Sequence, residues 1–219
     1  MSLATFYFYS DVLNSSQKIS IPLPEPKTML TEEKSEMEVL YLLHGAQGSE
    51  HSWVSSSNVE RFLYESERNM AVIIPTMKTN FYTDHKIGDK YYTYIAKELP
   101  KIVETYLNVS FKRENTYVAG LSMGGVETKL ITLRRPEVFG YWGLLSGGVY
   151  QPDDIKDPKA VKYIFESCGS KENPEGINKS VEALKAAGFN AEGFISEGTA
   201  HEFLTWRRSL YLMAQKLFK

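Results

Sequence analysis

The stretch "TYVAGLSMGGVETKL", residues 116–130, decides the fold class of this chain. It begins with a run that is typical of a strand and ends with a run that is typical of a helix, and a single serine, Ser122, stands at the junction. Glycines lie on both sides of this serine, so that "GLSMG", residues 120–124, fits the pattern G-x-S-x-G. At a strand–turn–helix junction this pattern indicates a serine whose oxygen is lifted above a sheet.

The glycines around Ser122 have a physical reason. Side chains at Gly120 and Gly124 would collide with the neighbouring strand and helix, so that only glycine fits there. The helix that follows points its amide N–H groups and its positive dipole end toward the serine. The alternatives are a glycine-rich turn with an incidental serine and a phosphate-binding loop, and the second lacks the expected lysine. We therefore interpret Ser122 as a nucleophile.

The rest of the chain alternates between strands and helices from residue 37 onward, which predicts a mostly parallel sheet between two layers of helices. The expected strands are residues 37–45, 70–75, 115–122, 141–147, 161–169 and 190–198, and the expected helices are residues 58–68, 88–107 with a kink at Pro100, 123–135, 178–188 and 202–218. Two further runs, residues 3–9 and 17–23, have no helix between them and predict an antiparallel edge hairpin. The prediction is an α/β fold in a single domain over residues 1–219.

Composition excludes several classes of protein. The formal net charge is -2 and the 25 basic residues are scattered, so we expect neither a nucleic-acid partner nor an anionic membrane partner. No apolar run approaches the roughly 18 residues of a membrane span. The only cysteine, Cys168, rules out an internal disulfide and reads as a packed thiol. The first residues lack the basic start of a signal peptide, which favours a cytoplasmic location unless a leader has been removed for secretion.

A serine nucleophile needs a base and an acid that orients the base. In the open α/β-hydrolase arrangement the chain order is serine, acid, histidine. The histidines are His44, His51, His85 and His201, and only the last follows Ser122. His201 also lies in the short segment "GTAHEF" between the last strand and the last helix, so we predict that it is the base.

The acid is expected directly after the strand 161–169. Glu172 lies at the predicted tip of that loop, and a glutamate can hold the imidazole as an aspartate does. Asp153 and Asp154, in the loop one strand earlier, and Glu175 stay open as alternatives.

Acyl transfer also needs N–H donors for the oxyanion that develops. One is expected to be the backbone N–H of Met123 and the other that of Ala46, in the segment "LLHGAQG". Gly45 and Gly48 let this loop turn toward the substrate, and His44 can brace it by hydrogen bonding.

Aromatic residues in loops at the carboxyl ends of the strands could line an acyl or aryl pocket, since ligands bind at this edge of such sheets. They are Trp53, Phe81, Tyr82, Tyr150 and Phe203. The alternative for each of them is an ordinary core or surface position. The chain is too short for a large lid, which predicts an open site.

Four segments, "YLLHG", "TNFYTDHKIGDKYYTYIAKELPKIVETYL", "VAGLSMGG" and "CGSKE", resemble the esterase D-like esterase family. This group includes tributyrin esterases, feruloyl and acetyl-xylan esterase modules and S-formylglutathione hydrolases. The resemblance implies an α/β-hydrolase fold without a lid and a Ser–acid–His carboxylesterase that uses no metal or cofactor. It supports Ser122 and His201 as catalytic residues and Ala46 and Met123 as amide donors.

Two residues depart from the family pattern. Glu172 stands where members usually carry aspartate, in a pattern like "CGTED", and Glu127 stands in a helix that usually continues with small residues.

The sequence therefore predicts a serine carboxylesterase that acts on short-chain acyl esters, such as acetyl esters, or on feruloyl-type esters. Its substrate would be a small-molecule ester or an acylated sugar. The alternatives are a non-catalytic hydrolase-fold binding module and an acyltransferase or thioesterase that uses the same site. The oligomeric state, including a homo-oligomer, is left open.

Overall fold

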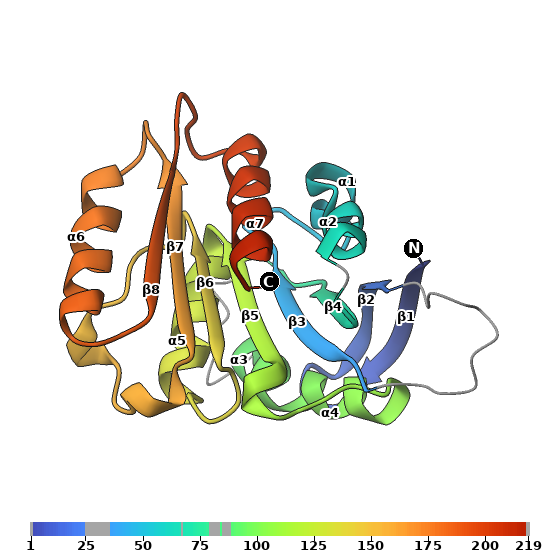
Figure 1. The fold of residues 1–219 in the computed structure, drawn as a ribbon. Helices are drawn as coiled ribbons and strands as arrows, with labels where there is room; N and C mark the ends of the chain where they lie inside the picture. Colours follow the sequence, from blue (N-terminus) through green and yellow to red (C-terminus); the bar gives the residue numbers. More distant parts are fainter. Residues whose placement is uncertain (1, 25–35, 67, 79–83, 85–88, 218–219) are drawn as a thin grey trace.

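A computed structural model describes residues 2–24, 36–66, 68–78, 84 and 89–217. Its centre is an eight-stranded sheet with the strand order β1-β2-β4-β3-β5-β6-β7-β8 (Figure 1). The order places β5, which ends just before Ser122, in the interior of the sheet. This is the mostly parallel α/β architecture that the sequence predicts.

The six strands from β3 onward are parallel to one another and form the core of the sheet. They are β3 (Glu38–Leu43), β4 (Met70–Pro75), β5 (Thr116–Leu121), β6 (Tyr141–Leu145), β7 (Tyr163–Gly169) and β8 (Ala191–Ser196). Every residue of β4, β5 and β7 is buried. Burial on both faces explains why these strands appear in the sequence as continuous apolar runs rather than as alternating ones.

The N-terminal edge of the sheet is antiparallel, as expected from the missing helix. Strand β1 (Ser2–Ser10) pairs with β2 (Ser15–Leu23) over their full lengths, and β2 then pairs with β4 through Ile19 and Ser20 only. The outward face of β1 is exposed at alternate residues, which fits an edge strand with one face on the core.

Helices cover both faces of the sheet (Figure 1). One face packs against α1 (Ser52–Ser57), α2 (Val59–Ser66) and α7 (Phe203–Leu217). The other face packs against α3 (Tyr91–Thr93), α4 (Leu99–Tyr106), α5 (Met123–Arg134) and α6 (Pro174–Ala186). Short 3-10 turns lie at Arg113–Asn115, Pro152–Asp154 and Pro158–Ala160. The result is a three-layer sandwich.

Three helical segments differ from the sequence prediction. The expected helix 88–107 begins at Tyr91. Its irregularity is a π-helical turn over Tyr94–Glu98 rather than a kink at Pro100. Pro100 lies in the first turn of α4, where its missing N–H costs little. Helix α6 begins at Pro174, four residues earlier than predicted, because the Asn173 side chain caps it by accepting from the N–H of Gly176. Helix α1 is not predicted by the periodicity at all.

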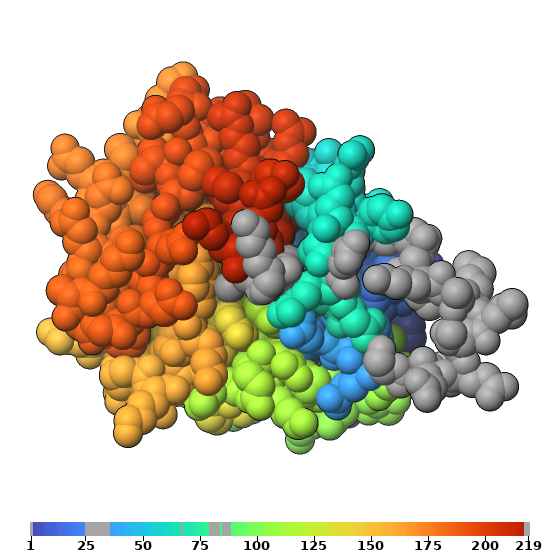
Figure 2. All heavy atoms as spheres, in the orientation of Figure 1, coloured from blue at the N-terminus to red at the C-terminus, as the bar shows by residue number. Residues whose placement is uncertain are grey.

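The C-terminal third of the chain forms one continuous side of the molecule in the space-filling view, where it is coloured orange to red (Figure 2). This part contains β7, α6, β8 and α7. None of the helices among the described residues has the length and apolar character that crossing a bilayer requires.

Candidate active site

Ser122 occupies the sharp turn between β5 and α5. Its backbone has φ 51° and ψ -118°, a conformation that residues with a side chain rarely adopt. The turn is held from both sides, because the N–H of Ser122 donates to Leu145 O at 2.9 Å and the N–H of Gly125 donates to Ser122 O at 2.9 Å. A strained serine that is fixed in this way is the feature that the sequence pattern predicts.

The glycines beside Ser122 are required by close approaches of the backbone. A Cβ atom on Gly120 would overlap the carbonyl group of Gly124. A Cβ on Gly124 would lie 2.6 Å from the carbonyl oxygens of both Leu43 and His44, at the end of β3. Helix α5 therefore starts against the neighbouring strand with no space for side chains, and the predicted need for glycine is confirmed.

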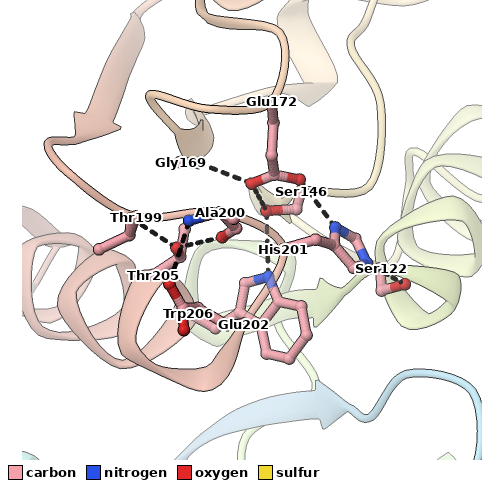
Figure 3. A network of polar contacts seen from close by, with 10 residues as sticks. All are labelled: Ser122, Ser146, Gly169, Glu172, Thr199, Ala200, His201, Glu202, Thr205 and Trp206. Atoms are coloured by element: carbon pink, nitrogen blue, oxygen red, sulfur yellow. Dashed lines mark hydrogen bonds and ion pairs between the residues drawn. The ribbon is translucent and has the colours of Figure 1, made fainter.

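The structure brings Ser122, His201 and Glu172 together in one line of hydrogen bonds (Figure 3). His201 lies between β8 and α7, and its Nε2 is 2.8 Å from Ser122 Oγ. Its Nδ1 is 2.7 Å from Glu172 Oε1, and Glu172 lies between β7 and α6. Each of the three side chains follows the carboxyl end of a strand, at the edge where parallel sheets bind their ligands.

The second oxygen of Glu172 is also occupied. Oε2 accepts hydrogen bonds from the backbone N–H of Gly169 at 2.6 Å and from the Ser146 hydroxyl at 2.8 Å. Partial burial opposes ionisation, but the hydrogen bonds from Gly169, His201 and Ser146 outweigh it and lower the pKa of Glu172 below its usual value. Glu172 is therefore an ionised carboxylate at neutral pH.

The alternative acids lie elsewhere. Asp154 forms an ion pair with Lys129 at 3.3 Å, and Asp153 is exposed in the same 3-10 turn. Glu175 is exposed in the first turn of α6, 3.8 Å from Lys179. The structure makes Glu172 the carboxylate that contacts His201.

The loop after β3 lies directly against the serine. A Cβ on Gly45 would lie 3.2 Å from the Ser122 Cβ, and the N–H of Gly48 donates to Gly45 O at 3.1 Å, which closes a turn around Ala46. His44 braces this turn as predicted, since its Nδ1 lies 2.7 Å from Gly45 O while its Nε2 accepts from the N–H of Met77 at 3.0 Å. Burial lowers the pKa of His44, so the neutral ring with its proton on Nδ1 is the form that satisfies both contacts.

Met123 is the first residue of α5. The first N–H groups of a helix have no partner within the helix, and the N–H of Met123 is one of them, directly after Ser122. Met123 and the loop that contains Ala46 both lie next to Ser122.

The aromatic residues that the sequence proposes as a pocket separate into three groups. Trp53 and Tyr150 are fully buried, and their polar atoms are satisfied inside the protein. The Trp53 indole donates to Leu43 O at 3.1 Å, and the Tyr150 hydroxyl contacts the Thr132 hydroxyl at 2.7 Å. Both belong to the core and offer no surface to a ligand. Phe203 is half-buried at the start of α7, near His201. Phe81 and Tyr82 lie outside the described residues.

A family model described as "Putative esterase" matches residues 10–211 of the chain. The chain belongs to this esterase family. It is 49% identical over 222 residues to an "Endo-1,4-beta-xylanase/feruloyl esterase" of Xylanibacter ruminicola, an alignment that covers 97% of this chain and 31% of that protein. It is 27% identical over 130 residues to an "Acetyl esterase" of Caldicellulosiruptor saccharolyticus, which covers 57% of this chain and 48% of that protein. The esterase thus spans about a third to a half of the length of these relatives.

Among solved structures, the fold is similar to FphF, a fluorophosphonate-binding serine hydrolase of Staphylococcus aureus. The TM-score is 0.83, and the match covers 100% of this chain and 98% of that chain at 19% identity. The α/β-hydrolase architecture that the sequence predicts is confirmed. The chain belongs to an esterase family and both relatives are named as esterases, which agrees with the predicted enzyme class of carboxylic ester hydrolase.

Sequence reasoning did not single out Ser146 and Trp206, which complete the surroundings of Glu172 and His201 in the esterase (Figure 3). Ser146 follows β6 directly, as Ser122 follows β5, and it too has a positive φ, 52°. The signal that could have found it is the run "LLSGG", residues 144–148, in which a serine at the end of a buried strand is followed by glycines.

Glu127, the second departure from the family pattern, lies inside the protein. Its side chain is fully buried in α5, and neither carboxyl oxygen has a hydrogen-bond partner among the residues that the structure describes. Burial raises the pKa of Glu127 to about 10, with Arg134 opposing the shift and Asp84 adding to it. The esterase therefore carries a neutral carboxylic acid five residues after Ser122.

Proposed function

We propose that the chain is a serine carboxylesterase in which Ser122 is the nucleophile, His201 the general base and Glu172 the orienting acid. The observation that supports this best is the pair of hydrogen bonds on His201, 2.8 Å to Ser122 and 2.7 Å to Glu172. A nucleophile, a base and an acid in this order are the recurring arrangement for acyl transfer.

In the first half-reaction the Ser122 oxygen attacks the ester carbonyl carbon while its proton passes to Nε2 of His201. The carbonyl electron pair moves onto oxygen, and the N–H groups of Met123 and Ala46 stabilise this oxyanion. The ionised Glu172 stabilises the imidazolium that forms. Collapse of the intermediate breaks the bond to the leaving alcohol, which takes the proton from Nε2.

The second half-reaction repeats these steps with water. His201 removes a proton from water, and the hydroxyl oxygen attacks the acyl group that is bound to Ser122. Collapse of the second intermediate breaks the bond to Ser122, whose oxygen takes back the proton from Nε2. The carboxylic acid leaves, and the site returns to its starting state.

For the substrate we propose short-chain acyl esters, such as acetyl groups on sugars, and feruloyl-type esters. The names of the two relatives, one a feruloyl esterase with a xylanase and the other an acetyl esterase, favour these classes. Phe203 is half-buried, two residues after His201, and is in edge-to-face contact with Trp206, with ring centroids 5.1 Å apart. It offers an aromatic wall to an aryl or acyl group.

A non-catalytic binding module is the less favoured alternative. Its support in the sequence is the glutamate in place of aspartate, and Glu172 nevertheless reaches His201 at 2.7 Å. Since the extra methylene does not keep the carboxylate from the imidazole, the substitution gives no reason to expect an inactive site.

The proposal is tested with p-nitrophenyl acetate and methyl ferulate as substrates and with a fluorophosphonate probe. We expect the wild-type protein to hydrolyse the esters and to bind the probe covalently at Ser122, located by mass spectrometry of the labelled peptide. Ser122→Ala should lose both properties, and only a residual acceleration of about 10³–10⁴ over water should remain from binding and the oxyanion donors.

Ser170→Ala is a matched control, because Ser170 lies two residues before Glu172 and its hydroxyl accepts from the N–H of Gly198. This variant should keep its activity and its labelling. Hydrolysis by Ser122→Ala at the wild-type rate, or a probe attached to another residue, would contradict the proposal.

A further inference from the structure

The Ser146 hydroxyl lies between the acid of the proposed triad and an indole. It donates to Glu172 Oε2 at 2.8 Å and accepts from Trp206 Nε1 at 3.0 Å (Figure 3). Ser146 is half-buried after β6, and Trp206, on α7, is 8% exposed. The end of β6 and helix α7, which are far apart in the sequence, thus meet beside Oε2 of Glu172.

The chemistry of the indole fixes the direction of this chain of hydrogen bonds. An indole N–H can only donate, so Ser146 Oγ must be the acceptor in its contact with Trp206. The single hydroxyl proton of Ser146 is then free to point to Glu172. Donors therefore converge on Glu172 from both sides, with Ser146 and Gly169 on Oε2 and His201 on Oε1.

Trp206 also contacts the base. The centroids of its ring and of the His201 ring are 5.0 Å apart, and the rings are nearly perpendicular at 87°. An edge-to-face contact of this kind favours one orientation of the imidazole over its rotated alternatives. The same indole therefore fixes the acid through its N–H and the base through its ring.

The backbone of Ser146 is built to place the hydroxyl there. Its φ of 52° lies in the left-handed region, and its N–H donates to Ser167 O on β7 at 2.7 Å. A non-glycine residue in this region is strained, and such strain persists where the surrounding structure fixes it. The hydroxyl gives a reason for a serine, rather than a glycine, at this position.

A glutamate needs this support more than an aspartate does. Its additional methylene gives it one more rotatable bond, so that Oε1 keeps its place at His201 only when Oε2 is held. The two donors to Oε2 are the N–H of Gly169, a backbone group that does not depend on a side chain, and the hydroxyl of Ser146, which does.

We propose that Ser146 and Trp206 are positioning residues of the esterase, which together hold the Glu172 carboxylate and the His201 imidazole in the orientation that activates Ser122. This inference rests on the proposed function. Neither residue touches the ester, and both act through the acid and the base.

The test compares Ser146→Ala, Ser146→Gly and Trp206→Phe in the hydrolysis of p-nitrophenyl acetate. Each variant removes one link of the hydrogen-bond chain, and Trp206→Phe keeps an aromatic ring beside His201. We expect kcat to fall about 10- to 100-fold in the two Ser146 variants, the usual effect of losing a hydrogen bond to a charged group. In Trp206→Phe, which loses a hydrogen bond between neutral groups, we expect a fall of about 2- to 10-fold, and KM should change less than about threefold in each variant. The double variant Ser146→Ala/Trp206→Phe should have nearly the same kcat as the slower of the two single variants, because both substitutions interrupt the same chain of hydrogen bonds.

Two controls remove the same chemical groups elsewhere in the core. Ser209→Ala deletes a buried hydroxyl that donates to Thr205 O on α7, and Trp142→Phe deletes an indole N–H that donates to Phe139 O. Both should keep the wild-type kcat. If loss of a buried hydrogen bond alone lowered kcat, these controls would be slowed as well.

A readout that needs no turnover is the downfield proton resonance of Nδ1–H of His201, followed by NMR at low temperature. We expect it in the wild-type protein, in Ser122→Ala and in both controls, and we expect it to broaden or vanish in Ser146→Ala and Ser146→Gly. Ser146→Gly matters here because glycine relieves the positive φ, so a loss in this variant is due to the missing hydroxyl and not to a strained fold.

The results separate this inference from the proposed function. An active wild-type protein whose Ser146 variants keep both kcat and the resonance would overturn the role of Ser146 and Trp206 and leave the esterase proposal intact. A wild-type protein without activity on any ester would overturn the proposed function, while the resonance would still report whether Ser146 orients Glu172 and His201.

Discussion

Glu172 Oε1 lies 2.7 Å from Nδ1 of His201, and both oxygens of this carboxylate are engaged in hydrogen bonds. A side chain in this setting selects the tautomer of the imidazole, because an acceptor at Nδ1 keeps the proton there and leaves Nε2 free to take the proton of Ser122. In the proposed mechanism, the position of Glu172 therefore decides whether Ser122 can be activated.

We predict that Glu172→Gln lowers kcat by about 10³- to 10⁴-fold on p-nitrophenyl acetate. The amide is neutral, so it cannot stabilise the imidazolium, and its NH₂ group can reverse the tautomer of His201. Steady-state kinetics measure the change. Glu175→Gln is the matched control in the same segment, since Glu175 is exposed and pairs with Lys179, and it should be as active as the wild type. A Glu172→Gln variant within tenfold of the wild-type kcat would rule out Glu172 as the acid.

Glu172→Asp introduces the residue that the family resemblance leads us to expect at this position, yet we expect this variant to be slower than the wild type. The shorter side chain cannot keep the contacts with His201 and with Ser146 and Gly169 at once, and a displacement of about 1 Å can cost as much as 100-fold. We expect a loss of about 10-fold or more in kcat, measured under the same conditions. Equal or higher activity would mean that the site accepts either length and that the contacts to Oε2 do not fix the geometry.

The strained backbone of Ser122 predicts a difference in stability between two inactive variants. Ser122→Gly removes the hydroxyl and also relieves the unfavourable φ of 51°, whereas Ser122→Ala removes the hydroxyl alone. We expect Ser122→Gly to have the higher free energy of unfolding, by about 1 kcal/mol or more, measured by urea denaturation. If Ser122→Ala were the more stable of the two, the turn would not be strained by its side chain.

The sequence reveals the parts of the site that depend on local pattern or on chain order. Ser122 is indicated by its glycines and His201 by its place after the last strand, and the structure brings the two within 2.8 Å. Ser146 and Trp206 are 60 residues apart, and their contact depends on how α7 packs against the end of β6, which no local pattern encodes.

For the aromatic residue Trp53, the sequence wrongly suggests a place in the site. Trp53 follows a strand at the edge where ligands bind, so its place in the chain suggests a pocket wall. In the folded protein its indole turns inward to the carbonyl of Leu43, and the ring packs edge-to-face on Phe203. The place of a residue in the chain indicates where its backbone lies. It does not indicate where a large apolar side chain points, because that depends on the core space that the side chain can fill.

Glu127 predicts an unusual dependence of stability on pH. Its pKa is raised to about 10 in the folded protein, against about 4.5 in the unfolded chain, because burial disfavours the charged form. Above pH 4.5 the unfolded chain loses a proton that the folded protein keeps. The contribution of Glu127 to the free energy of unfolding is therefore fully present below pH 4.5. It is lost progressively as the pH rises toward 10, at about 1.4 kcal/mol per pH unit.

Glu127→Gln keeps the shape of the side chain and cannot ionise, so it should remove this loss. We expect the difference in unfolding free energy between the variant and the wild type to grow in favour of the variant from pH 5 to pH 9, measured by urea denaturation at several pH values. Glu166, also buried and with its pKa raised to about 7, is present in both proteins, so its effect cancels in the difference. The exposed Glu175→Gln is the control and should show no such trend. A difference between Glu127→Gln and the wild type that stayed constant across this range would mean that Glu127 is ionised in the folded protein and is stabilised there by a charge or a water.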